Sequence, residues 1–210
     1  MNLKHVCVAL LVSVAASAHA DPITWNQWTS NSTGTMGPVA VTFAGETSSG
    51  WYAAYPSWTP ATTWADGVVI DNNPTGGIIR LLGGSTQVNT LTFSKPVVDP
   101  VVAIWSLGQG SIAPSFDFIG AAPIFVVGGP SAEYVGSSIY VVGNSVFGAE
   151  GNGSVLFKGT YTSLSWTNPK AEDWYGFNVG ITAAVPEPET YALTALGLLA
   201  LGAVARRARS

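Results

Sequence analysis

Apolar and polar residues alternate with a period of two along several short stretches of the chain. In residues 39–44, Val39, Val41 and Phe43 are separated by smaller or polar residues. The same alternation recurs at Val155/Phe157, at Leu164/Trp166 and at Phe177/Val179/Ile181. A period of two is typical of a strand with one buried and one exposed face, so each stretch is predicted to be a half-buried strand.

Two other stretches are apolar without interruption, residues 101–107 and 124–127, which predicts strands covered on both faces. Glycine, asparagine and proline form turn signals at 83–84, 108–110, 128–130, 151–153 and 168–169. We find no helical periodicity of 12 residues between Asp21 and Val185. About ten short strands at this spacing predict an all-β domain, an antiparallel two-sheet sandwich of the jelly-roll or lectin-like kind.

The C-terminal end has a different pattern. Residues 191–205 are uncharged and mostly apolar, and Arg206, Arg207 and Arg209 follow them. As a helix, residues 191–205 would reach roughly 22 Å at about 1.5 Å per residue, and snorkelling arginines make up the difference to the ~30 Å bilayer core. We therefore predict one C-terminal transmembrane helix with its basic tail, residues 206–210, in the cytoplasm and the body outside.

The N-terminal end is typical of a secretory signal peptide. Lys4 and His5 precede an apolar stretch, and Ala18-His19-Ala20 forms a small-x-small site. Signal peptidase is expected to cleave after Ala20. The predicted organisation is a signal peptide at 1–20, a β-sandwich domain at 21–185 and a C-terminal signal at 186–210.

Pro186-Glu187-Pro188 begins this last segment, and the two prolines keep it extended. The order of triplet, apolar stretch and basic tail resembles the PEP-CTERM sorting signal of Gram-negative bacteria that produce exopolysaccharide. The resemblance implies processing by exosortase, a membrane transpeptidase. It also implies an intermediate anchored in the inner membrane and facing the periplasm, followed by a cell-surface or extracellular location.

A second resemblance covers about half of the body. Residues 93–108, 151–159, 163–166 and 174–177 are similar to the bodies of other PEP-CTERM proteins. This resemblance implies a sandwich and carries no catalytic role.

The charge and composition of residues 21–185 exclude several classes of function. Ten acidic residues oppose four basic ones, which gives a formal charge of −6 and argues against nucleic acid as a partner. Both histidines and the single cysteine lie in residues 1–20. The mature body therefore lacks the residues for Ser-His-Asp or Cys-His catalysis, for the usual zinc sites and for disulfides.

Aromatic residues are densest at Trp51, Tyr52, Tyr55 and Trp58, with Trp64 nearby. Flat rings stack on the apolar faces of sugars, so the first four residues are candidates for carbohydrate contact. The alternative is that these rings cover the end of the sandwich, because tryptophan buries a large area.

Asp66, Asp71 and Asn72 gather oxygen atoms of the kind that bind calcium. The alternative is ordinary turn chemistry, which uses the same residues. We predict no cofactor, with calcium at these residues as the alternative.

A glycosidase requires two carboxyl groups across a cleft. The candidates in the body are Glu46, Glu133, Glu150, Glu172 and Asp173. In a strand, Glu172 and Asp173 would point to opposite faces.

We therefore predict an exported, non-enzymatic surface or extracellular-matrix protein that exosortase sorts. Its expected role is structural or interactive in the polysaccharide-rich envelope, with exopolysaccharide as a candidate partner. A carbohydrate-binding module is the alternative, followed by a glycoside hydrolase.

Overall fold

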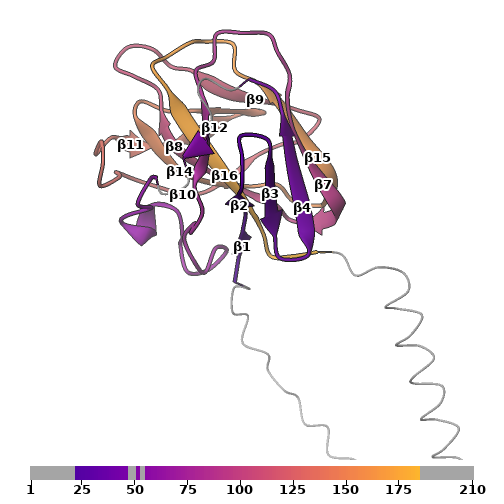
Figure 1. The fold of residues 1–210 in the computed structure, drawn as a ribbon. Coiled ribbons are helices and arrows are strands. Elements are labelled where there is room, and N and C mark those ends of the chain that lie inside the picture. The colour runs from indigo at the N-terminus through magenta and orange to yellow at the C-terminus, as the bar shows by residue number, and fades with distance from the viewer. Residues whose placement is uncertain (1–21, 47–50, 53–54, 185–210) are drawn as a thin grey trace, which may run out of the picture.

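Two β-sheets packed face to face form the body of the protein (Figure 1). The computed structural model describes residues 22–46, 51–52 and 55–184. The eight-stranded sheet contains β1 (Thr24–Trp25), β5 (Trp51–Tyr52), β6 (Ile78–Leu81), β8 (Val101–Leu107), β10 (Ile124–Gly128), β11 (Ser137–Ser138), β14 (Gly151–Leu156) and β16 (Tyr175–Ile181). The nine-stranded sheet contains β2 (Gln27–Trp28), β3 (Thr33–Met36), β4 (Val39–Ala44), β7 (Asn89–Val98), β9 (Ser115–Ile119), β12 (Tyr140–Val142), β13 (Ser145–Phe147), β15 (Thr160–Thr167) and β17 (Ala183–Ala184).

The strand order of each sheet is non-sequential, and nearly all neighbours are antiparallel. The eight-stranded sheet runs β10-β14-β8-β16-β6-β5, with β1 added to β16 and β11 parallel to β14. The nine-stranded sheet runs β12-β13-β9-β15-β7-β4-β3-β2, with β17 added to β7. The predicted all-β two-sheet sandwich is confirmed, while the finer jelly-roll or lectin-like type stays a prediction. Within the described residues the one helix is a single 3₁₀ turn, η1 (Ala61–Thr63).

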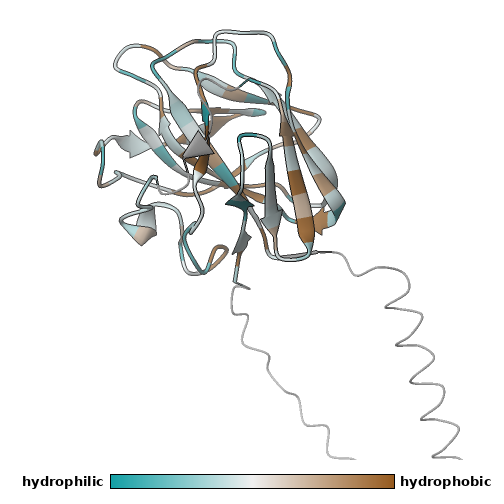
Figure 2. Ribbon diagram, in the orientation of Figure 1, coloured by the Kyte–Doolittle hydropathy of each residue, from teal (hydrophilic) through white to brown (hydrophobic). Residues whose placement is uncertain are grey.

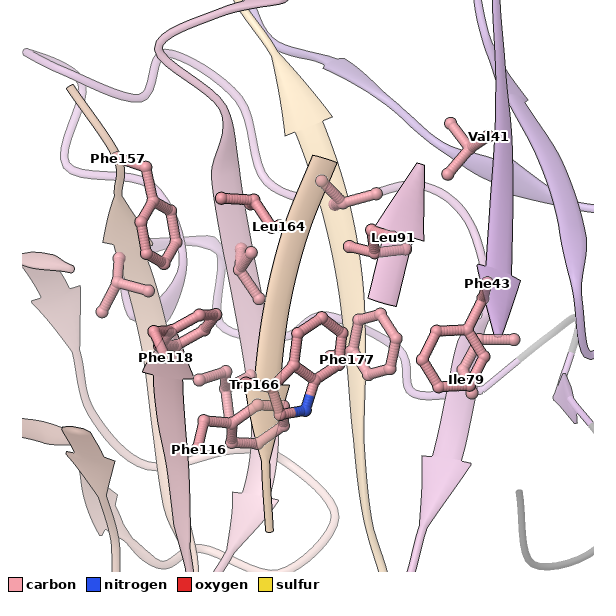
Figure 3. Packing of buried hydrophobic residues seen from close by; sticks show 14 of the residues in the cluster. Val41, Phe43, Ile79, Leu91, Phe116, Phe118, Phe157, Leu164, Trp166 and Phe177 are labelled. Carbon is pink, nitrogen blue, oxygen red and sulfur yellow. The ribbon is translucent and has the colours of Figure 1, made fainter. Parts of the chain in front are cut away.

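The space between the sheets, which we call the inner core, is filled by side chains that alternate along the strands. Along β4, Val39, Val41 and Phe43 are buried and the residues between them are exposed, as predicted. Figure 2 shows this alternation as brown bands separated by paler ones on the nine-stranded sheet. Further in, Trp166 packs 5.1 Å from Phe177 and 5.7 Å from Phe116 between ring centroids (Figure 3).

The eight-stranded sheet is covered on its other face as well. Residues 55–77, the cover segment, lie over that face and bury an outer core of ten residues: Ile23, Trp25, Trp58, Trp64, Ile70, Ile78, Val101, Ala103, Trp105 and Leu156. In β8, Val102 and Ile104 belong to the inner core, and Val101, Ala103 and Trp105 belong to the outer core. Every residue of β8 is buried, so the prediction of a strand covered on both faces is confirmed.

The cover segment overturns the half-buried prediction for two strands. All residues of β14 and β16 are buried, including those between the predicted core positions. The intervening residues of β16 are Gly176, Asn178 and Gly180, and the two glycines lie directly against Ile78 and against Ile23 and Trp25. The alternation of small and apolar residues in β16 predicted that the small residues face solvent. In the structure the two glycines instead allow other side chains to pack closely against the strand.

Strand β10 departs from its prediction in the other direction. It was expected to be covered on both faces, but Ile124 is 46% exposed and Phe125 is 45% exposed. The reason is its position, because β10 is an edge strand of the eight-stranded sheet and pairs only with β14 along that path. An apolar stretch does not distinguish a central strand from an edge strand.

Both ends of the described chain lie at one end of the sandwich. Thr24 pairs with Ile181, and Ala183 pairs with Val98 in the neighbouring sheet (Figure 1). Several predictions concern residues outside the described ranges: the signal peptide with cleavage after Ala20, the motif Pro186-Glu187-Pro188, the helix at 190–205 and the tail with Arg206, Arg207 and Arg209. Of the helical structure that is described, none has the length and apolar character needed to cross a membrane.

Candidate functional site

Of the four candidates for carbohydrate contact, Trp58 has the alternative role, that of covering the sandwich. This residue is 3% exposed, and its ring meets that of Trp64 edge-on at 5.2 Å between centroids. Its indole N–H donates to the carbonyl of Gly76 at 2.7 Å. The cover segment folds onto the sheet, so Trp58 belongs to the outer core and has no free face for a ligand.

The other three candidates for carbohydrate contact, Trp51, Tyr52 and Tyr55, do not share the position of Trp58. Tyr55 is half-buried and packs edge-on against Trp105, with the ring centroids 5.1 Å apart. The backbone of Trp51 and Tyr52 forms β5, and their side chains lie outside what the structure describes.

Tyr55 instead joins a cluster of four rings from four segments of the chain. Trp105 lies at its centre, with ring centroids 4.9 Å from Trp174, 5.3 Å from Tyr134 and 5.1 Å from Tyr55. The guanidinium of Arg80 lies over the Trp174 ring, 4.8 Å from its centroid. Trp105 is completely buried, Tyr55 and Trp174 are half-buried, and Tyr134 is 49% exposed.

Beside these rings lies a cavity of about 250 Å³. It is lined by two rings, three carboxyl groups, an amide and a hydroxyl, from Ser106, Gln109, Tyr134, Glu150, Glu172, Asp173 and Trp174. The strand register explains how they meet, because Leu107 pairs with Gly151 and Trp105 pairs with Gly176. The last residues of β8 therefore lie beside the residues just before β14 and β16, at one end of these three neighbouring strands.

Hydrogen bonds fix the polar groups of the cavity. The hydroxyl of Ser106 donates to Oε2 of Glu150 at 2.5 Å, and the amide of Gly108 donates to Oε1 of Glu172 at 2.9 Å. Gln109 donates from Nε2 to Oδ2 of Asp173 at 2.8 Å. These three bonds hold the polar groups of the lining in fixed positions.

The backbone is unusual at the same place. Ser106 has φ 56° and Glu150 has φ 51°, the left-handed region that non-glycine residues rarely adopt. The amide of Ser106 is held by Oδ1 of Asn152 at 2.9 Å, beside an irregularity in the β8–β14 register. Each such residue costs on the order of 1 kcal/mol or more, and this local cost is typical of binding and catalytic sites.

Burial raises the pKa of Glu172 to about 8. The Gly108 amide opposes this rise, and the nearby carboxyl groups of Glu150 and Asp173 add to it. Glu172 consequently carries its proton at neutral pH and can donate a hydrogen bond from a carboxyl group. The cavity thus offers a protonated acid beside two further carboxyl groups.

Of the five predicted glycosidase candidates, the cavity brings together Glu150, Glu172 and Asp173. The expectation that the last two point to opposite faces does not apply, because both lie in the loop before β16 and not in a strand.

The other two candidates have structural partners elsewhere. Glu46 accepts from the amides of Leu82, at 2.9 Å, and Gly83. Glu133 accepts from the Ser57 amide at 2.7 Å and from the Trp105 indole at 3.4 Å.

Sequence reasoning did not single out Ser106, Gln109, Tyr134 or Trp174 as site residues. One feature of the sequence could have indicated the site: Trp174 directly follows two acidic residues, Glu172 and Asp173. Nothing in the sequence links these residues to Ser106 or Tyr134, since that link arises from strand register.

In two of the three calcium candidates, Asp66 and Asn72, a side-chain oxygen accepts hydrogen bonds from backbone amides. Oδ1 of Asp66 accepts the amides of Val68, Val69 and Ile70 at 2.9–3.1 Å. Asn72 bonds through both side-chain atoms to the backbone of Ile23. Asp71 is exposed, and within the described ranges no group of three or more His, Cys, Asp or Glu residues is arranged to hold a metal ion.

Comparison with known proteins identifies one end of the chain. Residues 184–209 match the family model of the PEP-CTERM protein-sorting motif. No curated protein and no solved structure matches the chain. The match agrees with the resemblance of the C-terminal segment 186–210 to this signal, and it implies an exported protein that exosortase sorts.

Proposed function

We propose that this chain, which carries a PEP-CTERM sorting signal, is a non-enzymatic protein of the polysaccharide-rich envelope that binds saccharide units in its cavity. Export and exosortase sorting follow from the motif at residues 184–209. The structural or interactive role of the body is our own inference.

The observation that carries the proposal is the composition of the cavity. Tyr134 and Trp174 supply rings that can stack on the apolar face of a sugar, and Ser106, Gln109 and the three acids supply hydrogen-bonding groups. A few fixed polar groups beside aromatic walls are the usual design of a small-ligand site. The volume of about 250 Å³ is below that of most drug-sized pockets, so it suits a single sugar unit.

The position of the cavity also supports the proposal. In β16 the cavity-side residue Gly176 pairs with Trp105, and Gly180 at the other end pairs with Val101. The described chain begins and ends beside Ile181, at that other end of the sheet. A ligand in the cavity would therefore bind at the opposite end of the sheet from the segment that leads to the sorting motif.

One observation favours a second candidate, a glycoside hydrolase. The protonated Glu172 shares the cavity with Glu150 and Asp173, and an acid beside a carboxylate is the pair that glycosidases use. Incubation with oligosaccharides followed by product analysis tests this candidate. Release of reducing ends by the wild type, lost in Glu172→Gln, would replace the non-enzymatic proposal.

Two tyrosines of equal exposure provide the binding test. Tyr134, in the cavity, and Tyr140, on β12, are both 49% exposed, so their substitution by alanine should cost similar stability. Tyr134→Ala is expected to weaken retention on purified exopolysaccharide about tenfold, a loss of about 1.4 kcal/mol, and Tyr140→Ala should leave it unchanged. Equal retention of Tyr134→Ala and the wild type, with unchanged unfolding midpoints, would refute the cavity as the binding site.

The sorting step has a separate test. Deletion of Pro186–Ser210 should redirect the protein, detected with antibody in cell-surface, membrane and medium fractions, because the match to the sorting motif lies almost wholly in this segment. An unchanged distribution would contradict exosortase sorting without affecting the cavity proposal.

A further inference from the structure

The cavity is acidic beyond what sugar hydroxyl groups require. Glu150, Glu172 and Asp173 all line it, and the lining that the structure describes contains no lysine or arginine. Like charges in one small space raise one another's cost of ionisation, and both neighbours do this to Glu172. A ligand with a positive charge would relieve this repulsion, and a neutral ligand would not.

The aromatic walls suit a cation as well. The Trp174 ring already holds the guanidinium of Arg80 at 4.8 Å from its centroid, and Tyr134 presents a half-exposed ring nearby. Aromatic faces attract cations through their quadrupole, and the attraction grows when the cation is partly desolvated. Rings and carboxyl groups together form a lining that is complementary to an ammonium group.

We propose that the sugar unit bound in this cavity is an amino sugar with a free, protonated amino group. The inference rests on the proposed function and names its ligand class. The ammonium group would lie among Glu150, Glu172 and Asp173, and the sugar ring would stack on Tyr134 or Trp174.

The charge of the body excludes the opposite ligand class. Residues 21–185 have a formal charge of −6, so uronic acids and sulfated sugars would be repelled both at a distance and inside the cavity. An N-acetylated sugar would bury the carboxyl groups without a counter-charge, which costs free energy. Only the free amine pairs with the acids that line this space.

Titration of the purified full chain in detergent, followed by calorimetry, tests the inference. The two ligands are glucosamine and N-acetylglucosamine oligomers of equal length, at about pH 6 so that the free amine is protonated. We expect at least about tenfold tighter binding of the glucosamine oligomer. This preference should shrink in about 1 M salt, where the screening length falls to about 3 Å.

A pair of exposed aspartates supplies the matched variants. Asp173→Asn should remove most of the preference for the free amine, and Asp71→Asn, which lies outside the cavity lining, should leave it unchanged. Spermidine, a polyamine without a sugar ring, is the third ligand. If it binds as tightly as the glucosamine oligomer, the stacking component of the inference is wrong.

The outcomes separate the two proposals. Equal binding of both oligomers, lost together in Tyr134→Ala, would overturn the amino-sugar inference and leave the saccharide site in place. Binding of neither oligomer and no retention on exopolysaccharide would overturn both. A glucosamine preference that Asp173→Asn leaves intact would place the ligand elsewhere and overturn the inference.

Discussion

The eight-stranded sheet separates two interiors that are built in different ways. The inner core is closed by a second regular sheet, and its centre is a row of rings: Phe43, Phe116, Trp166 and Phe177 (Figure 3). The outer core is closed by the irregular cover segment, residues 55–77, and its largest residues are tryptophans.

Three tryptophans of the outer core donate hydrogen bonds to carbonyl groups far from them along the chain. Trp25 bonds to the carbonyl of Asn72 at 2.9 Å, Trp58 to that of Gly76 at 2.7 Å and Trp64 to that of Ile104 at 3.1 Å. In the inner core, the indole of Trp166 bonds to Asn168, two residues along the chain. The indole of Trp28 has no hydrogen-bond partner among the described residues.

This difference follows from the backbone of each covering layer. A sheet satisfies its own carbonyl groups through its ladder, so the inner core needs only apolar area and close packing. An irregular segment has no ladder, and its buried carbonyl groups must find other donors. Trp25 and Trp58 each supply apolar area and a donor to a carbonyl group of the cover segment, whereas Trp64, which lies in that segment, donates to a carbonyl group of β8.

The candidate site lies at the rim of the outer core. Trp105 belongs to that core and contacts both Tyr134 and Trp174 of the cavity. Irregular segments held by directed bonds can bring polar groups together at a sheet edge, which a repeating ladder cannot do. Apart from Ser106 in β8, the lining residues of the cavity come from such irregular stretches at the ends of strands, and none belongs to the cover segment.

The largest effect is expected in the inner core. Phe177 is completely buried and lies within 5.4 Å of the Phe43 and Trp166 ring centroids. Phe177→Ala should lower the free energy of unfolding by about 3–5 kcal/mol, because it leaves a cavity in a close-packed region. Urea denaturation measures this change, with Val142→Ala, at a position 60% exposed, as the control within about 0.5 kcal/mol of wild type. A loss below about 1 kcal/mol would mean that the inner core is not the stabilising centre described here.

The second prediction compares the two interiors directly. Trp58→Phe keeps an aromatic ring but leaves the buried Gly76 carbonyl without its donor, which should cost about 1–3 kcal/mol beyond the loss of area. Trp28→Phe loses similar area but no hydrogen bond, so its cost should be smaller. Both changes are read from urea denaturation midpoints. Equal costs would show that directed bonds do not distinguish the two cores.

The sequence predicted the inner core better than the outer one, and the contrast has a physical reason. The period of two in residues 39–44 reports a regular strand with one buried face, and β4 has that form. Trp58 and Trp64 lie in a segment without periodicity, so nothing indicated which rings face inward. The prediction that β16 has a solvent face was wrong for a related reason. Gly176 and Gly180 have no side chain, which permits close packing of outer-core residues against the strand.

The candidate site was only partly predictable. The acids were recognised as candidates, yet their meeting depends on the register of β8 with β14 and β16, which no local pattern encodes. The loop placement of Glu172 and Asp173 reversed the strand-based expectation, since a loop can turn two consecutive side chains to one side. The sorting signal, in contrast, is local and was recognisable from consecutive residues.

The smallest effect is expected at the rim of the outer core, and it depends on pH. Glu172 has an ordinary pKa of 4.5 in the unfolded chain and one of about 8 in the folded protein, mainly because burial disfavours its charge. Between these values the folded state holds a proton that the unfolded state has lost. The contribution of Glu172 to the free energy of unfolding should therefore fall as the pH rises from about 4.5 to 8 and become level above 8.

Replacing the Glu172 carboxyl group measures how much it contributes to the change of unfolding free energy with pH. Glu172→Gln keeps the size and the acceptor for the Gly108 amide but cannot ionise, so its stability should fall less over the same range. The difference between the two proteins should reach on the order of 1 kcal/mol by pH 8, once solvent screening of this partly exposed group is discounted. Urea midpoints at pH 5, 6, 7 and 8 measure the difference, with Glu133→Gln as a control whose carboxyl lies outside the cavity lining. Parallel curves for wild type and Glu172→Gln would mean that the Glu172 carboxyl group is as open to water as one on the protein surface, and that burial at the rim of the outer core does not raise its pKa.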